Sequence, residues 1–262
     1  MQEASAGLRV LDTPSEYWKK ISEKMDANLL VYGYENFRNT LDRWYVGQYR
    51  DEEHHKYIAT AWDYLYETYP KDILDKFSES SEGKPYAFKY KDRYVTMDLA
   101  VSLNEYFVMD KAIGFKNIKT IHEVGAGYGR TAYIIKALHP EIKYTIFDIE
   151  PSLSIAKKYL STLLKDNLIE YKSPSELDGG CDLLLTIDCL HEMLKEQIDA
   201  YFDYANKCKY FYFTCANEYY IPYDDIHWNR KDYPIKDTWK VLLNQEHVIR
   251  PAYFEVLCQT SA

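Results

Sequence analysis

Glycine residues are concentrated in one short segment, Glu123-Val124-Gly125-Ala126-Gly127-Tyr128-Gly129, where three of the chain's ten glycines fall within five positions. Glycine is needed where the backbone adopts a positive φ and where a ligand approaches the main chain without a Cβ in the way. The segment follows an apolar run, Ile118 to Val124, and precedes a helical pattern, so it is a strand-to-helix turn. We therefore expect a ligand to lie against this turn.

The glycine spacing narrows the kind of ligand. Strand-to-helix turns of this type most often hold dinucleotide pyrophosphates through a GxGxxG pattern, but here the pattern is GxGxG and Arg130 stands where that fingerprint has glycine. Glu123, two residues before Gly125, would repel a pyrophosphate but could attract an ammonium or sulfonium group. The same fingerprint has an acid about 20 residues later, and Asp148, 19 residues beyond Gly129, lies at the end of the next apolar run.

A candidate general base follows another apolar run, Cys181 to Ile187, in the segment Asp188-Cys189-Leu190-His191-Glu192. Loops after the strands of a parallel sheet open at its carboxyl edge, where doubly wound folds bind ligands. We predict His191 as the catalytic base and Glu192 as a group that orients its ring or binds substrate. The competing interpretation is that His191 caps or packs at the start of a helix and that Glu192 is a solvated first-turn acid.

An aromatic segment of mixed charge, from Glu218 to Arg230, is too irregular for a predicted helix or strand. Aromatic rings can stack on a sugar and an arginine can hold an anion. The predicted substrate contacts are Tyr223, His227, Trp228 and Arg230. Asp224, Asp225 and His227 offer ligands for a divalent cation, but an exposed loop with a charged rim explains them equally well, and no metal is expected.

The elements that position these residues alternate along the second half of the chain. Apolar runs that are hydrophobic on both faces and separated by helical patterns predict a doubly wound α/β domain with a mostly parallel sheet. Its expected strands are 118–124, 144–149, 168–171, 181–187 and 210–215, and its expected helices begin near 131, 151 and 198. Residues 239–243 look helical, and 248–258 read as one strand or a tight pair.

The first part of the chain has a different pattern. Apolar residues recur at helical spacing, as in Ile58, Ala61, Trp62 and Leu65. We predict a helical N-terminal region over residues 1–115 and the α/β domain over 116–262. A polar stretch, Ser78 to Pro85, has the composition of an exposed loop and is the best internal breakpoint.

Composition excludes several classes of function. The chain has 262 residues, a formal charge of −9 and no basic run, so nucleic acid is not expected as a partner. No stretch approaches the roughly 18 apolar residues of a membrane span, and the N-terminus has no signal-peptide pattern, so we expect a cytoplasmic protein. The five cysteines form no CxxC pair, which favours buried, reduced thiols.

The ExGxGxG pattern after a first strand resembles motif I of class I S-adenosylmethionine-dependent methyltransferases, and the resemblance continues in order along about 75 residues. It implies a Rossmann-like fold that binds S-adenosyl-L-methionine and releases S-adenosyl-L-homocysteine. By this resemblance, Asp148 binds the ribose hydroxyls and Asp188 ends the motif IV strand, while the segment at Ser173 corresponds to the adenine loop without its usual acid. The implied cofactor contacts are Glu123, Gly125, Ala126, Gly127, Gly129, Asp148, Ile149, Ser173 and Asp188.

A narrower resemblance rests on shorter motifs. Gly127-Tyr128-Gly129-Arg130, Asn36-Phe37-Arg38, Phe147-Asp148-Ile149-Glu150 and Ala156-Lys157-Lys158-Tyr159-Leu160 look like bacterial sugar O-methyltransferases of capsule and lipooligosaccharide gene clusters. This implies a small-molecule partner: a sugar, a sugar nucleotide or a phosphoramidate-bearing sugar. A neutral hydroxyl acceptor needs a base, whereas an amine or phosphate needs little help, so the base candidates discriminate between substrates.

Two other functions stay open at the level of sequence. The first is an NAD(P)-dependent oxidoreductase; Glu123, and Arg130 in place of glycine, count against it. The second is a non-catalytic, cofactor-binding partner of a related methyltransferase.

Overall fold

The structure is a computed structural model that describes residues 10–40, 52–164, 169–222 and 224–260. The chain divides into two compact units. One is Ser22–Val108, and the other combines the described residues before Ser22 with those from Met109 onward. The sequence prediction placed the division at 115 and 116 and assigned all earlier residues to one region. Each unit is described separately below.

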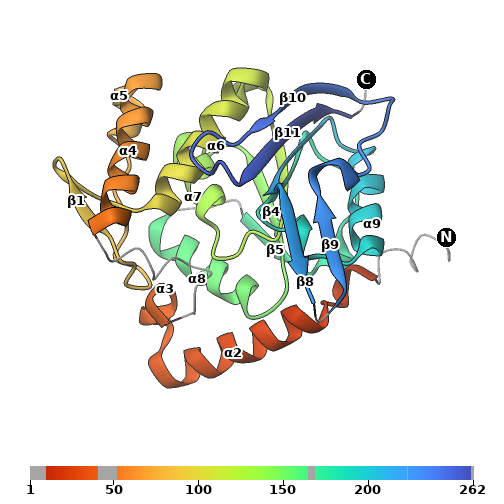
Figure 1. The fold of residues 1–262 in the computed structure, drawn as a ribbon, viewed down its shortest axis with the longest axis horizontal. Coiled ribbons are helices and arrows are strands. Elements are labelled where there is room, and N and C mark those ends of the chain that lie inside the picture. Colours follow the sequence, from red (N-terminus) through yellow and green to blue (C-terminus); the bar gives the residue numbers. More distant parts are fainter. Residues whose placement is uncertain (1–9, 41–51, 165–168, 223, 261–262) are drawn as a thin grey trace. The chain divides into compact units, whose positions relative to one another are not determined.

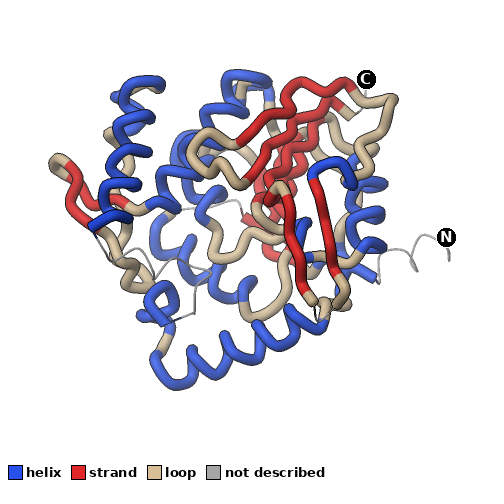
Figure 2. The backbone as a smooth tube through the Cα atoms, in the orientation of Figure 1, coloured by secondary structure: helices blue, strands red, loops and turns tan. Residues whose placement is uncertain are grey.

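A seven-stranded sheet forms the centre of the larger unit (Figures 1 and 2). Its order is β10-β11-β7-β6-β3-β4-β5, and β11 alone runs antiparallel to both of its neighbours. The strands are β3 (Thr120–Val124), β4 (Lys143–Phe147), β5 (Ile169–Lys172), β6 (Leu183–Ile187), β7 (Tyr210–Ala216), β10 (Lys240–Glu246) and β11 (Tyr253–Gln259). This confirms the predicted doubly wound α/β domain.

Helices connect the parallel strands, with α7 and α8 on one side of the sheet and α9 on the other (Figure 1). They are α7 (Arg130–Leu138), α8 (Ser152–Leu163) and α9 (Lys195–Ala205). The short 3-10 helices of this unit are η1 (Val10–Asp12), η3 (Phe115–Asn117), η4 (Pro174–Glu176), η5 (Leu190–Glu192) and η6 (Arg230–Asp232). Every residue of β6 from Leu183 to Thr186 is buried, as expected of a central parallel strand that is covered on both faces.

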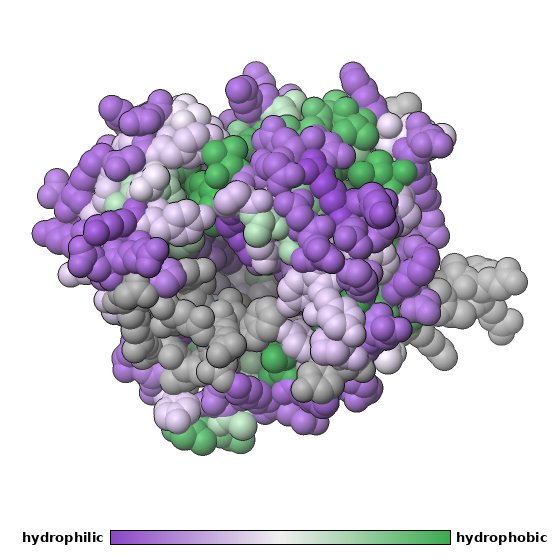
Figure 3. Space-filling view, viewed as in Figure 1, coloured by the Kyte–Doolittle hydropathy of each residue, from purple (hydrophilic) through white to green (hydrophobic). Residues whose placement is uncertain are grey.

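The Ser22–Val108 unit is mainly helical. It contains most of α2 (Glu16–Tyr32) and α6 (Met97–Ile113), together with η2 (Tyr34–Asn36), α3 (Phe37–Thr40), α4 (Glu52–Thr68), α5 (Lys71–Leu74) and a small hairpin, β1 (Phe88–Tyr90) and β2 (Arg93–Val95). The buried residues of α4 are Ile58, Ala61, Trp62 and Leu65, which confirms the predicted amphipathic face. At the end of α2, Leu30 and Val31 are strongly exposed. Figure 3 shows a face that is mostly hydrophilic, with hydrophobic patches in its upper part and at its lower edge.

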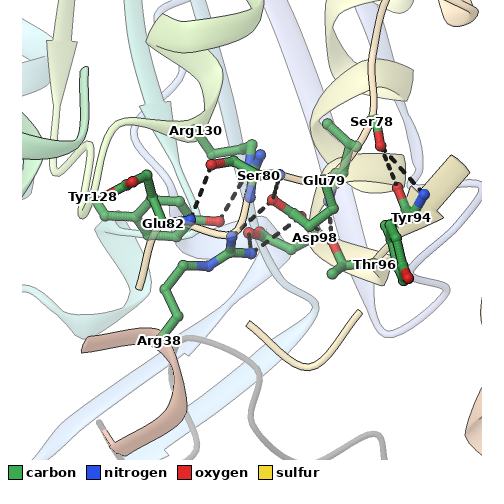
Figure 4. Close-up of polar contacts among 11 residues, drawn as sticks. Arg38, Ser78, Glu79, Ser80, Glu82, Tyr94, Thr96, Asp98, Tyr128 and Arg130 are labelled. Carbon is green, nitrogen blue, oxygen red and sulfur yellow. Dashed lines mark hydrogen bonds and ion pairs between the residues drawn. The ribbon is translucent and has the colours of Figure 1, made fainter. Parts of the chain in front are cut away.

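The polar stretch from Ser78 to Pro85 is a loop, but the prediction that it is simply exposed is wrong. Glu79 is buried, and its carboxylate accepts two hydrogen bonds from the buried Arg38 guanidinium, at 2.8 and 3.2 Å (Figure 4). The Thr96 hydroxyl donates to the same carboxylate, and Asp98 lies 3.6 Å from Arg38. This buried ion pair anchors the loop, because each charge has lost its contact with water and is stabilised by the opposite charge of its partner.

Two predictions near the C-terminus are corrected, and a third is decided between its alternatives. Most of 239–243, expected to be helical, belongs to the edge strand β10, and 248–258 supplies one strand, β11, and not a tight pair. The segment from Glu218 to Arg230, expected to be irregular, forms a hairpin of β8 (Glu218–Ile221) and β9 (Ile226–Asn229). In windows this short, the apolar spacing does not separate strand from helix, and cross-strand pairing decides.

Candidate active site

The glycine turn joins β3 to α7, and its three glycines all have positive φ: +70° at Gly125, +58° at Gly127 and +89° at Gly129. A Cβ on Gly125 would lie 2.0 Å from the Sγ of Cys189, and one on Gly129 would lie 2.6 Å from the Cδ1 of Leu160. Backbone conformation and packing against protein side chains therefore require glycine at these two positions, in addition to any ligand.

Asp148 follows β4 and lies against this turn, as predicted. Its Oδ2 accepts a hydrogen bond from the Gly127 N–H at 2.9 Å, and its Oδ1 accepts one from the N–H of Ile149 at 2.7 Å. Burial raises the pKa of Asp148 to about 7, although these two hydrogen bonds act in the opposite direction. A hydrogen bond thus joins the glycine turn directly to a buried acid.

Three further predicted cofactor residues, Glu123, Ala126 and Ser173, make hydrogen bonds within the protein. Glu123, in β3, is buried and accepts a hydrogen bond from the Tyr144 hydroxyl at 2.7 Å. The carbonyl of Ala126 accepts the Gly129 N–H at 2.9 Å, which closes the turn. Ser173 follows β5 and caps η4, where its N–H donates to the Glu176 carboxylate at 2.8 Å.

The predicted base lies at the carboxyl edge of the sheet, just after β6. His191 is in η5 and only 1% exposed, and its Nε2 lies 3.5 Å from Asp188 Oδ1. Its ring makes an edge contact with Tyr219, with the ring centres 4.3 Å apart. The Nδ1 atom has no hydrogen-bond partner among the described residues. Burial lowers the pKa of His191 to about 4, so the imidazole is neutral at pH 7.

Glu192 is also buried, so the interpretation of a solvated first-turn acid is wrong. Its Oε1 accepts a hydrogen bond from the Tyr219 hydroxyl at 3.0 Å, and Trp18 forms a second hydrogen bond with the carboxyl group. Burial and the negative charge of Asp188 raise the pKa of Glu192 to about 8. At pH 7 this carboxyl group is therefore mostly protonated and can donate a hydrogen bond.

No sequence motif identifies two further residues of this cluster, Arg250 and Tyr253. The Nη2 of Arg250 lies 2.8 Å from Asp188 Oδ2, and the Tyr253 hydroxyl forms a hydrogen bond with the same carboxylate. Burial alone would raise the pKa of Asp188, but Arg250 and His191 outweigh it and hold that pKa below its usual value. Asp188 itself has a φ of +55°, a backbone conformation that is rare for a residue with a side chain.

The three predicted substrate residues that the structure describes differ in their surroundings. Trp228 is 8% exposed, stacks on Tyr233 and donates its indole N–H to the Met193 carbonyl at 3.1 Å. Its ring therefore packs in the core, and the prediction that it stacks on a sugar is corrected. The Arg230 guanidinium is paired with Glu246 at 2.6 Å. His227 is exposed. Tyr223 lies outside the described residues.

Asp224, considered above as a metal ligand, has another role. Its Oδ1 and Oδ2 accept hydrogen bonds from the Glu16 and Tyr17 N–H groups, at 2.8 and 2.9 Å, and so cap the N-terminus of α2. Over the described ranges, no group of three or more His, Cys, Asp or Glu side chains is arranged to hold a metal ion. Within the same ranges, no helix is long and apolar enough to span a membrane.

Comparisons with known proteins agree with this fold. Residues 62–179 match the sequence model of the O-methyltransferase domain family. No curated protein matches the sequence. Among solved structures, the mitomycin 7-O-methyltransferase MmcR is similar at 12% identity with a TM-score of 0.50, over 92% of this chain and 66% of that protein.

Two further structures are similar. The PH0226 protein of Pyrococcus horikoshii OT3 has 9% identity and a TM-score of 0.50, over 60% of this chain and 88% of that chain. An O-methyltransferase family protein from Burkholderia thailandensis has 15% identity and a TM-score of 0.48, over 63% of this chain and 57% of that one, so the match spans little more than half of its length. The chain has the class I methyltransferase fold, and a segment of it matches an O-methyltransferase domain.

Proposed function

We propose that this protein is an S-adenosylmethionine-dependent methyltransferase that methylates a neutral hydroxyl group. The observation that carries the proposal is the hydrogen bond of 2.9 Å between the Gly127 N–H and Asp148 Oδ2, which joins the positive-φ turn to a buried acid. This arrangement fits a nucleoside, because the Asp148 carboxylate beside the turn can accept further hydrogen bonds from ribose hydroxyls. When bound, S-adenosylmethionine supplies an activated methyl group and a good leaving group.

The choice of a hydroxyl acceptor rests on the base. A neutral hydroxyl is a poor nucleophile near pH 7, so a group must accept its proton. His191 has a neutral imidazole at pH 7 and an Nδ1 atom without a partner in the described part of the chain. Glu192, mostly protonated and bonded to Tyr219, can donate a hydrogen bond to an acceptor oxygen.

The acceptor class follows partly from charge. Arg250 and Arg230 are already neutralised, by Asp188 at 2.8 Å and by Glu246 at 2.6 Å. An anionic acceptor such as a phosphoramidate would have to compete for these cations, so a neutral sugar hydroxyl is favoured. The sugar itself, and a role in bacterial surface polysaccharide synthesis in the cytoplasm, are supported by the motif resemblance alone.

The first experiment is calorimetric titration of the protein with S-adenosylhomocysteine and, separately, with NAD. We expect heat from the former only. Binding of NAD alone would favour the oxidoreductase and refute the proposal.

The second experiment is a labelled-methyl transfer assay with sugar and sugar-nucleotide acceptors, comparing the wild type with His191→Ala. We expect the variant to bind S-adenosylhomocysteine and to lose at least about 100-fold in kcat, the usual contribution of a general base. Wild-type turnover in the variant would remove His191 from the reaction. Binding of S-adenosylhomocysteine without transfer to any acceptor would favour the non-catalytic partner.

A further inference from the structure

A continuous chain of charged and polar groups leads from the β10–β11 turn to the candidate base. The Arg250 guanidinium lies 2.8 Å from one oxygen of Asp188, and the other oxygen of Asp188 lies 3.5 Å from Nε2 of His191. The imidazole is 1% exposed, whereas the Asp188 side chain is 37% exposed, so the ring side of this contact is shielded from water and the carboxylate side is partly solvated. Arg250 lies 59 residues downstream of His191, in the turn between β10 and β11.

The turn that carries Arg250 is fixed by another histidine. The Nδ1 of the buried His247 accepts hydrogen bonds from the N–H groups of Ile249 and Arg250, at 3.2 and 3.1 Å. The guanidinium also lies over the ring of Tyr253, 3.4 Å from its centre. These contacts define the position of the Arg250 backbone and side chain before any ligand binds.

The other groups that face His191 are known. The rings of Tyr219 and Tyr253 contact it edge-on, with centres 4.3 and 5.9 Å away. Glu192 is its neighbour in η5, and the backbone N–H of His191 is directed at the thiol of Cys215 as a hydrogen-bond donor. Among these described neighbours, Asp188 and Arg250 are the two that act on the imidazole with opposite charge.

We propose that Asp188 and Arg250 are positioning residues for His191. Asp188 holds the proton of the neutral imidazole on Nε2, which leaves the lone pair on Nδ1 as the atom that takes the acceptor's proton. Arg250 holds the Asp188 carboxylate in place and neutralises its charge. The carboxylate can therefore orient the imidazole of His191 while the imidazole stays neutral. This inference rests on the proposed role of His191 as the base.

The two residues must act on the protonation of His191 in opposite directions. Asp188 stabilises the imidazolium form and Arg250 opposes it. Replacing Arg250 by glutamine leaves a carboxylate without its cation, which should make His191 easier to protonate. Replacing Asp188 by asparagine should make it harder to protonate and should weaken the preference for the Nε2 tautomer. A residue with only a packing role would not produce this opposition.

The experiment follows the His191 ring signals by NMR against pH in the intact, ligand-free protein, for the wild type, Arg250→Gln, Asp188→Asn and Arg250→Lys. We expect the midpoint to rise by about one pH unit in Arg250→Gln, to fall in Asp188→Asn and to return toward wild type in Arg250→Lys. Lys236→Gln, which removes the cation of the exposed Lys236–Asp203 pair, is the matched control and should not move it. Unchanged midpoints in both Arg250→Gln and Asp188→Asn would overturn the proposal.

A parallel measurement separates this proposal from the proposed function. In Arg250→Gln, the acidic limb of the kcat/KM profile should shift to higher pH together with the NMR midpoint. In Asp188→Asn, kcat should fall about tenfold or more, because the preference for the Nε2 tautomer is lost. If the NMR midpoint moves and the kinetic limb does not, His191 is not the base. Asp188 and Arg250 then have no catalytic group to position, and this inference is refuted as well. S-adenosylhomocysteine binding in the same samples tests the cofactor site independently of either result.

Discussion

Asp148→Asn should change the free energy of unfolding in a pH-dependent way and weaken cofactor binding. The carboxyl group is buried beside the glycine turn, and its pKa in the folded protein is about 7 against an ordinary value of 3.8. Because the folded-state value is the higher one, the favourable contribution is complete below pH 3.8 and is lost as the pH rises through 7. At about 1.4 kcal/mol per pH unit, the loss is about 4 kcal/mol.

The asparagine variant does not titrate, so its free energy of unfolding should gain on that of the wild type by about 4 kcal/mol between pH 4 and pH 7 and then level off. The exchange also has a pH-independent cost of about 1 to 3 kcal/mol, because an amide can accept only one of the two N–H groups of Gly127 and Ile149. Only the slope of the difference, not its absolute value, therefore reports on the carboxyl group.

Urea denaturation of both proteins at half-unit steps from pH 4.5 to 8.5, with tryptophan fluorescence as the probe, measures that slope. Asp199→Asn, which breaks the exposed ion pair of Asp199 with Lys195, is the control and should cost at most about 1 kcal/mol. Titration with S-adenosylhomocysteine in the same buffers should show at least a tenfold loss of affinity in the Asp148 variant. Parallel pH curves for wild type and Asp148→Asn would refute the raised pKa, and undiminished affinity would refute the ribose contact.

Substitutions at three other sites test the scaffold by urea denaturation. Gly129→Ala should cost about 2 to 4 kcal/mol, because φ is +89° and the new Cβ would lie 2.6 Å from Leu160; combining it with Leu160→Ala should relieve the collision but not the backbone strain. Asp224→Ala should cost about 1 to 2 kcal/mol through the lost helix cap, and Asp224→Asn much less; equal costs would refute the cap. Glu79→Gln should cost about 3 to 5 kcal/mol, because it leaves the buried Arg38 without its bidentate partner, and a near-neutral result would refute the buried pair.

The elements that the sequence predicts well are those with long, regular apolar patterns. The predicted α4 face, Ile58, Ala61, Trp62 and Leu65, is the buried set of that helix, and β6 lies within the predicted strand 181–187. Such patterns reflect burial on one or both faces, which is a local property of the sequence. The strand β10 was assigned wrongly because it is an edge strand that gains its partner, β11, only through the tertiary fold.

The candidate site is predictable where it lies at the ends of successive strands. The glycine turn, Asp148 and His191 all follow parallel strands, so topology alone brings them to one edge. Arg250 and Trp18 reach the same cluster from a distant turn and from the start of α2, and neither has a neighbouring motif. Trp228 shows the converse: an aromatic residue in a segment that looks exposed lies in the core, because the hairpin folds its ring onto Tyr233.

The groups of the site also explain why it has to be held by the rest of the fold. Burial makes Asp148 and Glu192 harder to ionise, so both weaken the folded state as the pH rises through about 7 and about 8. The same burial depresses the pKa of His191 to about 4, so below its ordinary value of 6.5 the unfolded chain takes up the proton first, and stability falls as the pH drops toward 4. Neutral His191 and protonated Glu192 therefore coexist between about pH 4 and pH 8, the range in which one can accept a proton and the other can donate a hydrogen bond. Ribose hydroxyls that donate to Asp148 would favour its ionised form, so a bound nucleoside would offset part of the instability that this acid creates.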